Sequence, residues 1–525
     1  MNDIDIKKEI YYKIGERLLK NGNMVRNVFK PWNFIKFILD YKRTMKDCYA
    51  YIIDMVKGTN SFEHIDQAIE VLDLLKIHWS NRQEYTYINQ VIGKYELLKN
   101  LTSREDYAYT PVKNRICYCL NHSLPYRGDG YVTRSQHMAE AMKNAGFDVI
   151  AVTRPGFPWD NVKAMKNRKD LPCEEEIGGI LYKRQYLSRE MARKDRYKYY
   201  DLAAQIWEKT FMELKPEYVI AASNNINAIP VLVAAKRLGI PFYYETRGLW
   251  EITRISKYPE YANTLAFYFE KYYEATVCNN AKYVFTLTKP LIDELESRGV
   301  NRDKICLVPN CANASMFNAA EKDMELAKKL NIPENVVTIG YLGTIQMYEG
   351  LDDLMKACAI LKNKGIDFRL LLVGGIANID KNDYGQYLKN LAKEINIEDK
   401  LIMPGKVPPT EVPKYYSLMD ITPFGRKPLP VCEMVSPIKP LEAMAMKKTV
   451  IVSDIAALKE IVKDNETGLY FQKGNIESYA EILEKVIKDI SLRERLGENA
   501  RKWVEENRQW SQNAETIKQI LTSKV

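Results

Sequence analysis

The sequence predicts an α/β protein with two doubly wound parallel sheets in tandem, preceded by an all-helical region. The first observation is a change in the pattern of apolar residues near residue 115, where short apolar runs begin to alternate with segments of helical periodicity. The second is a restart of this alternation near residue 336, after a more polar stretch. The third is the length of 525 residues, which is too great for one compact core.

Residues 1–110 are expected to form a helical N-terminal region. Apolar residues recur at steps of three and four through residues 62–75, and another helix fits residues 85–101. Residues 24–39 are basic, aromatic and apolar. This composition suits a membrane surface, and it equally suits packing against the next domain or another subunit, which we favour. The region is therefore expected to position the protein, through a homo-oligomer, a partner or a membrane surface.

Residues 111–312 are expected to form the first α/β domain. Apolar runs bounded by turn residues predict its strands, and the segments of helical period between them predict crossover helices. The strands are predicted at residues 115–120, 147–152, 218–222, 241–245 and 283–287, with helices that include 134–145 and 229–238, and the unit closes near 305–310.

Residues 313–500 are expected to form the second α/β domain, and residues 501–525 a closing helix. A linker with a short helix fits residues 313–334. Two tandem sheets whose carboxyl ends face each other create a cleft, and open α/β sheets bind ligands at those ends. The strands of the second domain are predicted at residues 336–342, 368–373, 401–403, 419–423, 449–452 and 468–471.

Composition fits a soluble globular protein, with 46% hydrophobic and 28% charged residues. No run of about 20 apolar residues is present, and the acidic start differs from a secretory signal. The net charge of +9 is mild for this length, and no basic stripe with interleaved aromatics predicts a nucleic-acid partner. Nine scattered cysteines without zinc-type spacing favour reduced thiols in a cytoplasmic protein.

The most informative segment is residues 431–446. It places Lys439 beside two prolines and Glu442 one turn into a helix, directly before a short β-branched strand. A helix N-terminus offers free N–H groups and a positive dipole to a phosphate, and Lys439 adds a point charge. Glu442 can accept hydrogen bonds from a ribose diol. Taken alone, the segment fits equally well a buried helix whose polar residues are caps.

Glycine-containing loops follow several predicted strands. Glycine permits backbone shapes that other residues avoid, so such loops can approach a sugar or a phosphate closely. Thr344 adds a hydroxyl donor to one of these loops. His122, at the end of the first strand, is either a catalytic residue or a hydrogen-bonded structural histidine. The glycines in question are Gly128, Gly130, Gly343 and Gly374.

The order of these motifs resembles the retaining glycosyltransferases of family four. The resemblance covers about residues 113–525. It implies the GT-B fold, in which two Rossmann-like domains face each other across a cleft, with the acceptor on the first and a nucleotide-sugar donor on the second. It also implies that the final helix crosses back to the first domain. The motifs are the loop at 121–134, Tyr-Glu-Thr-Arg-Gly-Leu-Trp at 244–250, Val-Pro-Asn-Cys at 308–311, Tyr-Leu-Gly-Thr at 341–344, Leu-Val-Gly-Gly at 372–375 and Ser-Pro-Ile-Lys-Pro-Leu-Glu-Ala-Met-Ala at 436–445.

The resemblance implies roles for residues of the second domain. Glu442 matches the glutamate that holds the ribose hydroxyls, and Gly343 with Thr344 matches the turn that meets the diphosphate. Val407 lies where the backbone meets the base. The other donor-binding residues that it implies are Pro437, Ile438, Leu441 and Gly374.

Two departures from the family pattern concern the donor site. The first of the family's paired glutamates falls on Met434, so either a shifted loop brings Glu433 to the sugar or this glutamate is absent. Thr344 and Glu349 occupy the places where many members have an arginine and a lysine that clamp phosphates. A buried diphosphate requires cations, and we expect Lys439 and Arg426 to supply them.

A third departure concerns the acceptor side. Asn224 lies where a histidine often follows a strand of the first domain, and an amide can bond a sugar hydroxyl but cannot shuttle a proton. Glu245 and Arg247 follow another strand and are expected to face the cleft together with Arg134. Arg247 can orient a phosphate or an acceptor oxygen. Equally, Glu245 and Arg247 can pair with each other and stiffen the loop.

The sequence therefore predicts an enzyme that transfers a hexosyl or N-acetylhexosaminyl group from a uridine diphosphate sugar to a hydroxyl of a glycan, lipid-linked or protein acceptor. Retention of configuration and a role in cell-surface glycan synthesis or protein glycosylation are expected. No cofactor and no metal are expected, because cationic side chains serve the leaving diphosphate. Two rivals are a nucleotide-sugar epimerase on the same fold and a non-catalytic GT-B subunit. The predicted catalytic residues are Glu433, Lys439, Arg426 and His122, in a cytoplasmic protein that can lie at the inner face of the membrane.

Overall fold

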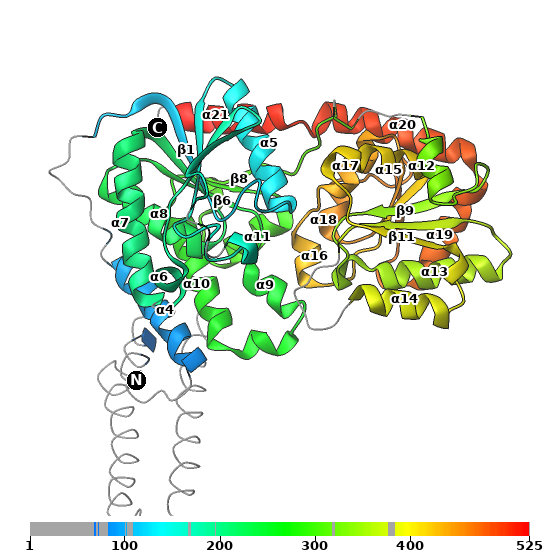
Figure 1. Ribbon diagram of the computed structural model, residues 1–525, viewed down its shortest axis with the longest axis horizontal. Coiled ribbons are helices and arrows are strands. Elements are labelled where there is room, and N and C mark those ends of the chain that lie inside the picture. The colour runs from blue at the N-terminus through cyan, green and yellow to red at the C-terminus, as the bar shows by residue number, and fades with distance from the viewer. Residues whose placement is uncertain are drawn as a thin grey trace, which may run out of the picture.

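Figure 1 shows the computed structural model of the protein, with two α/β domains side by side. The structure describes residues 68, 69, 72, 82–99, 101, 109–165, 168, 170–194, 196–314, 316–317, 321–375 and 384–523. The predictions for residues 24–39, and for nearly all of the helix at 62–75, lie outside the described residues.

The first domain is built on an eight-stranded sheet with the strand order β3-β4-β2-β1-β5-β6-β7-β8. All neighbouring strands are parallel except β3, which pairs antiparallel with β4 at one edge. The strands are β1 Val112–Leu120, β2 Asp148–Thr153, β3 Glu174–Ile177, β4 Ile180–Arg184, β5 Pro216–Ala222, β6 Phe242–Thr246, β7 Val284–Thr286 and β8 Ile305–Leu307.

Both faces of this sheet are buried, because successive side chains of a strand point to opposite faces. In β1, Cys117 and Cys119 face one core with their sulfurs 3.7 Å apart, whereas Ile116 and Tyr118 face the other. The helices of this domain are α5 Gly130–Asn144, α6 Arg189–Lys194, α7 Arg196–Leu214, α8 Asn225–Arg237, α9 Trp250–Ile255, α10 Leu265–Asn280 and α11 Lys289–Ser297, with short 3₁₀ turns η2 Lys163–Met165, η3 Pro259–Asn263 and η4 Arg302–Lys304.

The hairpin of β3 and β4 departs from the sequence prediction, which places no strand between residues 153 and 217. Three glutamates and one apolar residue make up β3, so no hydrophobic alternation marks it as a strand. Gly178 and Gly179 form its turn with φ values of 57° and 73°, which suit a tight hairpin. The acidic strand covers the edge of the sheet and protects it from pairing with other chains.

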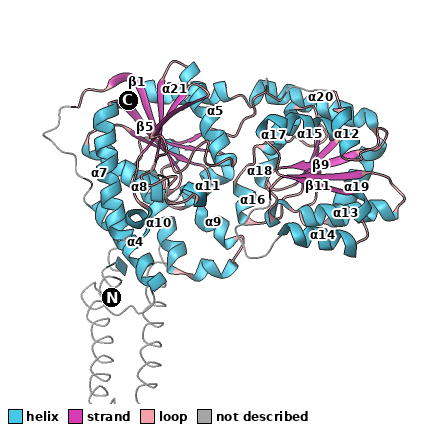
Figure 2. Cartoon of the chain, in the orientation of Figure 1, coloured by secondary structure: helices cyan, strands magenta, loops and turns pink. Residues whose placement is uncertain are grey.

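The second domain contains a parallel six-stranded sheet with the order β11-β10-β9-β12-β13-β14. Figure 2 shows the sheet between two helical layers, with α13, α14 and α19 on one side and α12, α15 and α17 on the other. The strands are β9 Thr338–Leu342, β10 Arg369–Val373, β11 Leu401–Gly405, β12 Ile421–Phe424, β13 Thr449–Ser453 and β14 Leu469–Phe471. The helices are α12 Met324–Lys329, α13 Leu351–Asn363, α14 Tyr384–Glu394, α15 Val412–Leu418, α16 Pro430–Met434, α17 Lys439–Ala445, α18 Ala456–Lys459 and α19 Ile476–Lys488, with η5 Met347–Glu349, η6 Glu398–Lys400 and η7 Pro409–Glu411.

The last two helices, α20 (Ile490–Asn507) and α21 (Trp510–Thr522), join the two domains along one side of the molecule (Figure 1). The first of them packs on α17 and β13 of the second domain, and the second packs on α5 of the first. Trp510 and Ala514 are buried in the core of the first domain. The chain therefore passes between the domains a second time after Asn507.

The N-terminal region enters the core of the first domain through α4 (Arg82–Lys99), which packs against α7 and α8. Lys94 is 1% exposed. Its Nζ donates to Asn225 Oδ1 at 2.6 Å and lies 3.2 Å from Glu270 Oε1. The hydroxyl of Tyr273 donates to the carbonyl of Val91 at 2.6 Å. A helix outside the family resemblance thus supplies part of the first domain's polar interior.

Replacement of Lys94 by methionine is expected to lower the free energy of unfolding by about 2–3 kcal/mol, because Glu270 and Asn225 lose a buried cationic partner. Chemical denaturation monitored by circular dichroism measures the change. Lys99→Met on the same helix is the control, since Lys99 is exposed. Equal stability of the two variants would contradict a structural role for Lys94.

Candidate active site

Residues 426–438, which connect β12 to α17 and include α16, form a junction loop between the domains. The loop contacts segments that follow β6, β7 and β8, so the carboxyl ends of strands from both sheets meet here. A Cβ added at Gly248 would lie 3.3 Å from Val435 Cγ2, which shows how closely the two domains approach. Among the described residues, the hydrogen bonds between this loop and the first domain are Val431 N to Ser256 Oγ at 3.0 Å, Thr288 Oγ1 to Met434 O at 2.5 Å and Asn310 Nδ2 to Ser436 O at 2.7 Å.

Arg426 and Lys439 flank one buried carboxylate. Glu349 is 4% exposed, and its Oε1 lies 3.5 Å from Arg426 Nη2 and 3.7 Å from Lys439 Nζ. Lys439 Nζ also donates to the hydroxyl of Tyr341 at 2.6 Å. Burial opposes ionisation of Glu349, but the charges of Lys439 and Arg426 lower its pKa. Two cations and one anion leave an excess positive charge at this end of the second sheet.

The side chain of Lys439 crosses the backbone at Gly343. A Cβ at Gly343 would lie 2.1 Å from Lys439 Cε, and a Cβ at Gly374 would lie 1.7 Å from the carbonyl oxygen of Gly343. Their φ values of 151° and 153° also favour glycine. Gly343 therefore leaves the space that the Lys439 side chain occupies, and Gly374 allows the loops after β9 and β10 to pack against each other.

Glu442 lies one turn after Lys439 and is half-buried. Its Oε2 accepts a hydrogen bond from the hydroxyl of Tyr416 at 3.3 Å. Burial raises the pKa of Glu442 to about 7, although the charges of Lys439 and of His137 on α5 favour the ionised form. The Glu442 carboxylate therefore changes its charge near neutral pH. It does so next to Lys439, and the charge of His137 in the first domain also acts on it.

The other residues predicted on the donor side occupy different environments. Leu441 is buried in the core, so its side chain packs within the domain. Thr344 is exposed at the loop after β9, and its carbonyl accepts a hydrogen bond from Tyr341 at 3.0 Å. Pro437, Ile438 and Val407 are half-buried in loops after β12 and β11.

Glu433 has partners within the second domain. Its Oε2 accepts from the backbone N–H of Ala456 at 2.7 Å, and its Oε1 pairs with Lys473 Nζ at 2.6 Å. Both oxygens are thus engaged at the start of α18. The shifted-loop alternative, in which Glu433 turns to a sugar, requires this carboxylate to leave both partners.

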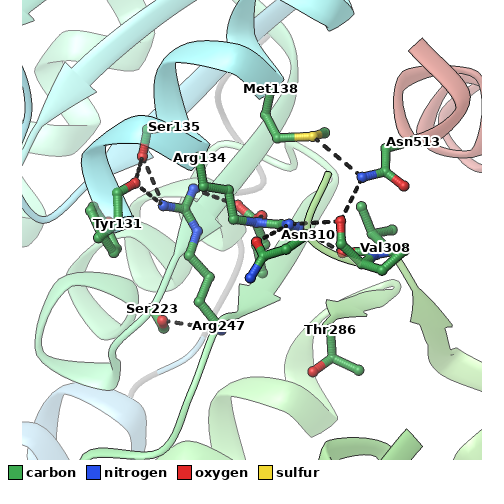
Figure 3. A network of polar contacts seen from close by, with 12 residues as sticks. Tyr131, Arg134, Ser135, Met138, Ser223, Arg247, Thr286, Val308, Asn310 and Asn513 are labelled. Atoms are coloured by element: carbon green, nitrogen blue, oxygen red, sulfur yellow. Dashed lines mark hydrogen bonds and ion pairs between the residues drawn. The ribbon is translucent and has the colours of Figure 1, made fainter. Parts of the chain in front are cut away.

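Arg134 and Glu245 are the centre of a buried polar network in the first domain. Figure 3 shows Arg134 of this network between Arg247 and Asn310. Arg134 Nε donates to Glu245 Oε1 at 2.7 Å, and its Nη2 donates to the carbonyl of Val308 at 2.7 Å. Its Nη1 donates to the carbonyl of Pro309 and to Asn310 Oδ1, both at 3.0 Å. Asn310 in turn holds the junction loop, so Arg134 links the first domain to the loop that precedes Lys439.

Arg247 also lies inside this network. It pairs with Glu245 at 2.7 Å, donates to Ser135 Oγ at 2.7 Å and hydrogen-bonds the hydroxyl of Tyr118. Burial opposes ionisation of Glu245, but Arg247 and Arg134 lower the pKa of this carboxyl to about 2. Of the two alternatives for Glu245 and Arg247, the structure shows the internal pair. The expectation that they point into a cleft is not met, because protein groups engage both side chains.

His122 and the glycine loop lie after β1. His122 Nε2 is 3.1 Å from Asp129 Oδ2, and its ring stacks on Tyr131 with centroids 4.4 Å apart. Asp129 also caps α5 by accepting from Val132 N at 3.2 Å. A Cβ at Gly128 or Gly130 would meet nothing within 4 Å, and neither residue has a positive φ. The predicted need for special backbone shapes is therefore wrong at these two glycines, which simply leave open space.

Asn224 and Asn225 follow β5. The carboxamide of Asn224 is 2% exposed and has no hydrogen-bond partner among the described residues. Asn225 instead joins the network around Lys94 and accepts its hydrogen bond. A ligand hydroxyl could satisfy Asn224 only if the surrounding loop opened, because its polar atoms are shielded.

Three residues that contact the junction loop or α17 were not predicted from the sequence as site residues. Tyr341 and Tyr416 supply hydroxyls to Lys439 and Glu442, but each lies in an apolar segment where an aromatic residue indicates only core packing. Asn310 donates to Ser436, and its position directly after Pro309, close to the end of β8, is a signal that could have identified it.

Among the described residues, no group of three or more histidine, cysteine, aspartate or glutamate side chains is arranged to hold a metal ion. Within the same part of the chain, every helix is too short or too polar to cross a membrane.

Two family models match the chain along its two sheet domains. Residues 129–311 match the glycosyl transferase 4-like domain, and residues 323–503 match the glycosyl transferases group 1. Together these segments make up more than half of the chain. The chain belongs to the glycosyltransferases of the family-four type. The family model boundaries agree with the division between the two sheets, and the GT-B fold expected from the resemblance is confirmed.

Curated proteins similar to this chain include several glycosyltransferases. The capsular polysaccharide biosynthesis glycosyltransferase CapM of Staphylococcus aureus is 30% identical over 172 residues, which are 32% of this chain and 41% of CapM. The chain spans about half the length of the curated relatives that it matches.

Many solved structures share the fold of this chain. Sucrose-phosphate synthase of Thermosynechococcus elongatus has a TM-score of 0.62 at 18% identity, over 77% of this chain and 98% of that one. HepE of Anabaena, solved in complex with UDP-glucose, has a TM-score of 0.60 at 13% identity, over 78% of this chain and 100% of that one.

Proposed function

We propose that this protein transfers a hexosyl or N-acetylhexosaminyl group from a uridine diphosphate sugar to a hydroxyl acceptor, with retention of configuration. The observation that carries the proposal is the meeting of Lys439 and Arg426 at Glu349, with the side chain of Lys439 crossing Gly343 and Glu442 one turn after Lys439. An excess positive charge next to a carboxylate suits a ligand with an anionic diphosphate and a ribose diol. The fold shared with HepE, whose solved complex contains UDP-glucose, supports the same ligand class.

In the proposed reaction the diphosphate binds Lys439 and Arg426, and the ribose hydroxyls donate to Glu442. Charge develops on the diphosphate oxygen as the bond to the sugar breaks, and the two cations stabilise it. The acceptor oxygen forms its bond to the sugar on the face that the diphosphate leaves. The departing diphosphate oxygen takes the acceptor's proton, so the reaction needs no separate protein base.

CapM, a capsular polysaccharide biosynthesis glycosyltransferase, supports a cell-surface glycan as the product. A cytoplasmic location at the inner face of the membrane, close to a lipid-linked acceptor, is consistent with that role. Residues 1–110, which the sequence predicts to be helical, would hold the enzyme there or in a homo-oligomer.

A thermal-shift screen of nucleotide sugars tests the proposal, because a ligand that binds only the folded state raises the melting temperature. The donors that bind are then incubated with and without candidate acceptors. Transfer that requires an acceptor supports the proposal, and isomerisation of the donor alone would identify an epimerase instead. Donor binding without transfer or hydrolysis would identify a non-catalytic subunit.

Full activity of both Lys439→Ala and Glu442→Ala would refute the assigned site.

The pKa of Glu442 predicts a pH dependence of donor binding. Since burial raises this pKa to about 7, the free protein carries more of the accepting carboxylate at pH 8 than at pH 6. UDP-glucose, whose diphosphate does not titrate in this range, is expected to bind about tenfold more tightly at pH 8 than at pH 6. Isothermal titration of wild-type protein and Glu442→Gln measures the effect. Identical pH profiles of the two proteins would contradict the role of Glu442.

A further inference from the structure

We propose that Glu349, a buried carboxylate that faces both Arg426 and Lys439, is a positioning residue that holds Lys439 as an ammonium ion directed at the donor diphosphate. This inference rests on the proposed function. It assigns a role to a buried carboxylate that would otherwise repel the proposed ligand.

The geometry places Glu349 behind the two cations. Its Oε1 is 3.5 Å from Arg426 Nη2 and 3.7 Å from Lys439 Nζ, longer than the 2.7–2.9 Å typical of a charge-assisted hydrogen bond. An ammonium group has three donors, and the hydrogen bond that Lys439 makes from Nζ goes to Tyr341 at 2.6 Å. The carboxylate therefore attracts the ammonium group without taking all of its donors.

The charges of Arg426 and Lys439 explain why a buried carboxylate, that of Glu349, lies beside them. Arg426 and Glu349 are both at least nine-tenths buried, and the Oε2 atom of Glu349 has no hydrogen-bond partner among the described residues. A buried carboxylate oxygen without a hydrogen bond is costly unless cations face it. Equally, two neighbouring buried cations repel each other unless an anion lies between them. The three charges therefore stabilise one another.

Burial and several charged side chains set the charge state of Lys439. Glu349 on η5 and Glu442 on α17 favour the ammonium form, whereas burial and Arg426, after β12, favour the neutral amine, and the net effect lowers the pKa of Lys439. Tyr341 on β9 receives its hydrogen bond, and Tyr416 on α15 lies 3.4 Å from its backbone carbonyl. Without Glu349 the lysine would lose its proton at a lower pH and would no longer neutralise a diphosphate.

Titration calorimetry with UDP from pH 7.5 to 9.5 tests the inference on the full-length protein. The ratio of the Kd of Glu349→Gln to the Kd of wild type is expected to rise about tenfold over this range, the change that one pKa unit produces. The uracil and the phosphates titrate identically in both proteins, so the ratio reports the protein alone. Glu484→Gln is the matched control, because Glu484 also lies between two lysines, Lys364 and Lys488, but on the surface.

Lys439→Met shows whether Glu349 acts through the lysine. Adding Glu349→Gln to this variant is expected to produce no further dependence on pH. If Glu349→Gln does not fold, the ratio of the Kd of wild type to the Kd of Lys439→Met decides, because this ratio cancels the titration of the uracil and is expected to rise with pH as the lysine of the wild type loses its proton. A ratio of Kd values that stays constant with pH, for Glu349→Gln or for Lys439→Met against wild type, would overturn this inference but not the proposed function. Wild-type protein that binds no UDP would overturn both.

Discussion

Replacement of Lys439 by methionine is expected to lower the rate of sugar transfer by about 10²–10³-fold, the loss typical when one preorganised charge donor is removed from a transition state. Methionine keeps the apolar stem that crosses Gly343, so the loops after β9 and β10 should remain packed. What disappears is the ammonium group that would face the departing diphosphate. The lowered rate should appear in kcat as well as in donor affinity, because the negative charge on the leaving group grows in the transition state.

Initial rates with the donor found by thermal shift, together with UDP affinity from calorimetry, measure this effect. Lys447→Met is the matched control, because Lys447 lies just after the same helix but is exposed and pairs with Glu498 at 2.7 Å. We expect the control to retain wild-type rates. A Lys439→Met protein whose kcat stays within about twofold of wild type would show that transition-state charge is stabilised elsewhere.

Replacement of Arg134 by methionine is expected to produce the largest loss of stability, about 3–5 kcal/mol, because it breaks a buried ion pair by removing one partner. Glu245 would keep Arg247, and the carbonyl of Pro309 would keep Asn513, but the carbonyl of Val308 and the side chain of Asn310 would lose the donor that Arg134 supplies. The melting temperature should fall by roughly 10 °C for a domain of this size. Since Asn310 also bonds the junction loop at Ser436, donor affinity should fall even below the melting transition.

Differential scanning fluorimetry and UDP titration at 20 °C separate the two effects. Arg168→Met is the control, since Arg168 pairs with Asp170 at 2.6 Å but both side chains are more than half exposed. Its stability should change by less than about 0.5 kcal/mol. Unchanged UDP affinity in a folded Arg134→Met protein would show that the network stabilises the first domain without positioning the junction loop.

The sequence predicts most strands of both sheets because parallel strands buried on both faces are continuous apolar runs. Residues 218–222 and 449–452 are examples, and both lie in strands of the structure. The strand β3 was not predictable in this way, because an exposed edge strand needs no apolar pattern. The position of α4 was equally hidden, since its amphipathic pattern does not say which domain covers it.

For the candidate site, the sequence determined which residue types are present: a lysine beside prolines, a glutamate one turn later and glycines after buried strands. These follow from local spacing, because consecutive turns of a helix and the ends of strands have fixed geometry. Only the tertiary structure decided which charges meet. Glu349 faces Arg426 and Lys439, whereas Glu433 turns to Lys473 and Arg247 turns inward to Glu245. The physical reason is that a buried charge must find a partner, and the partner is supplied by whichever distant segment the packing of the sheets and helices brings within a few ångströms.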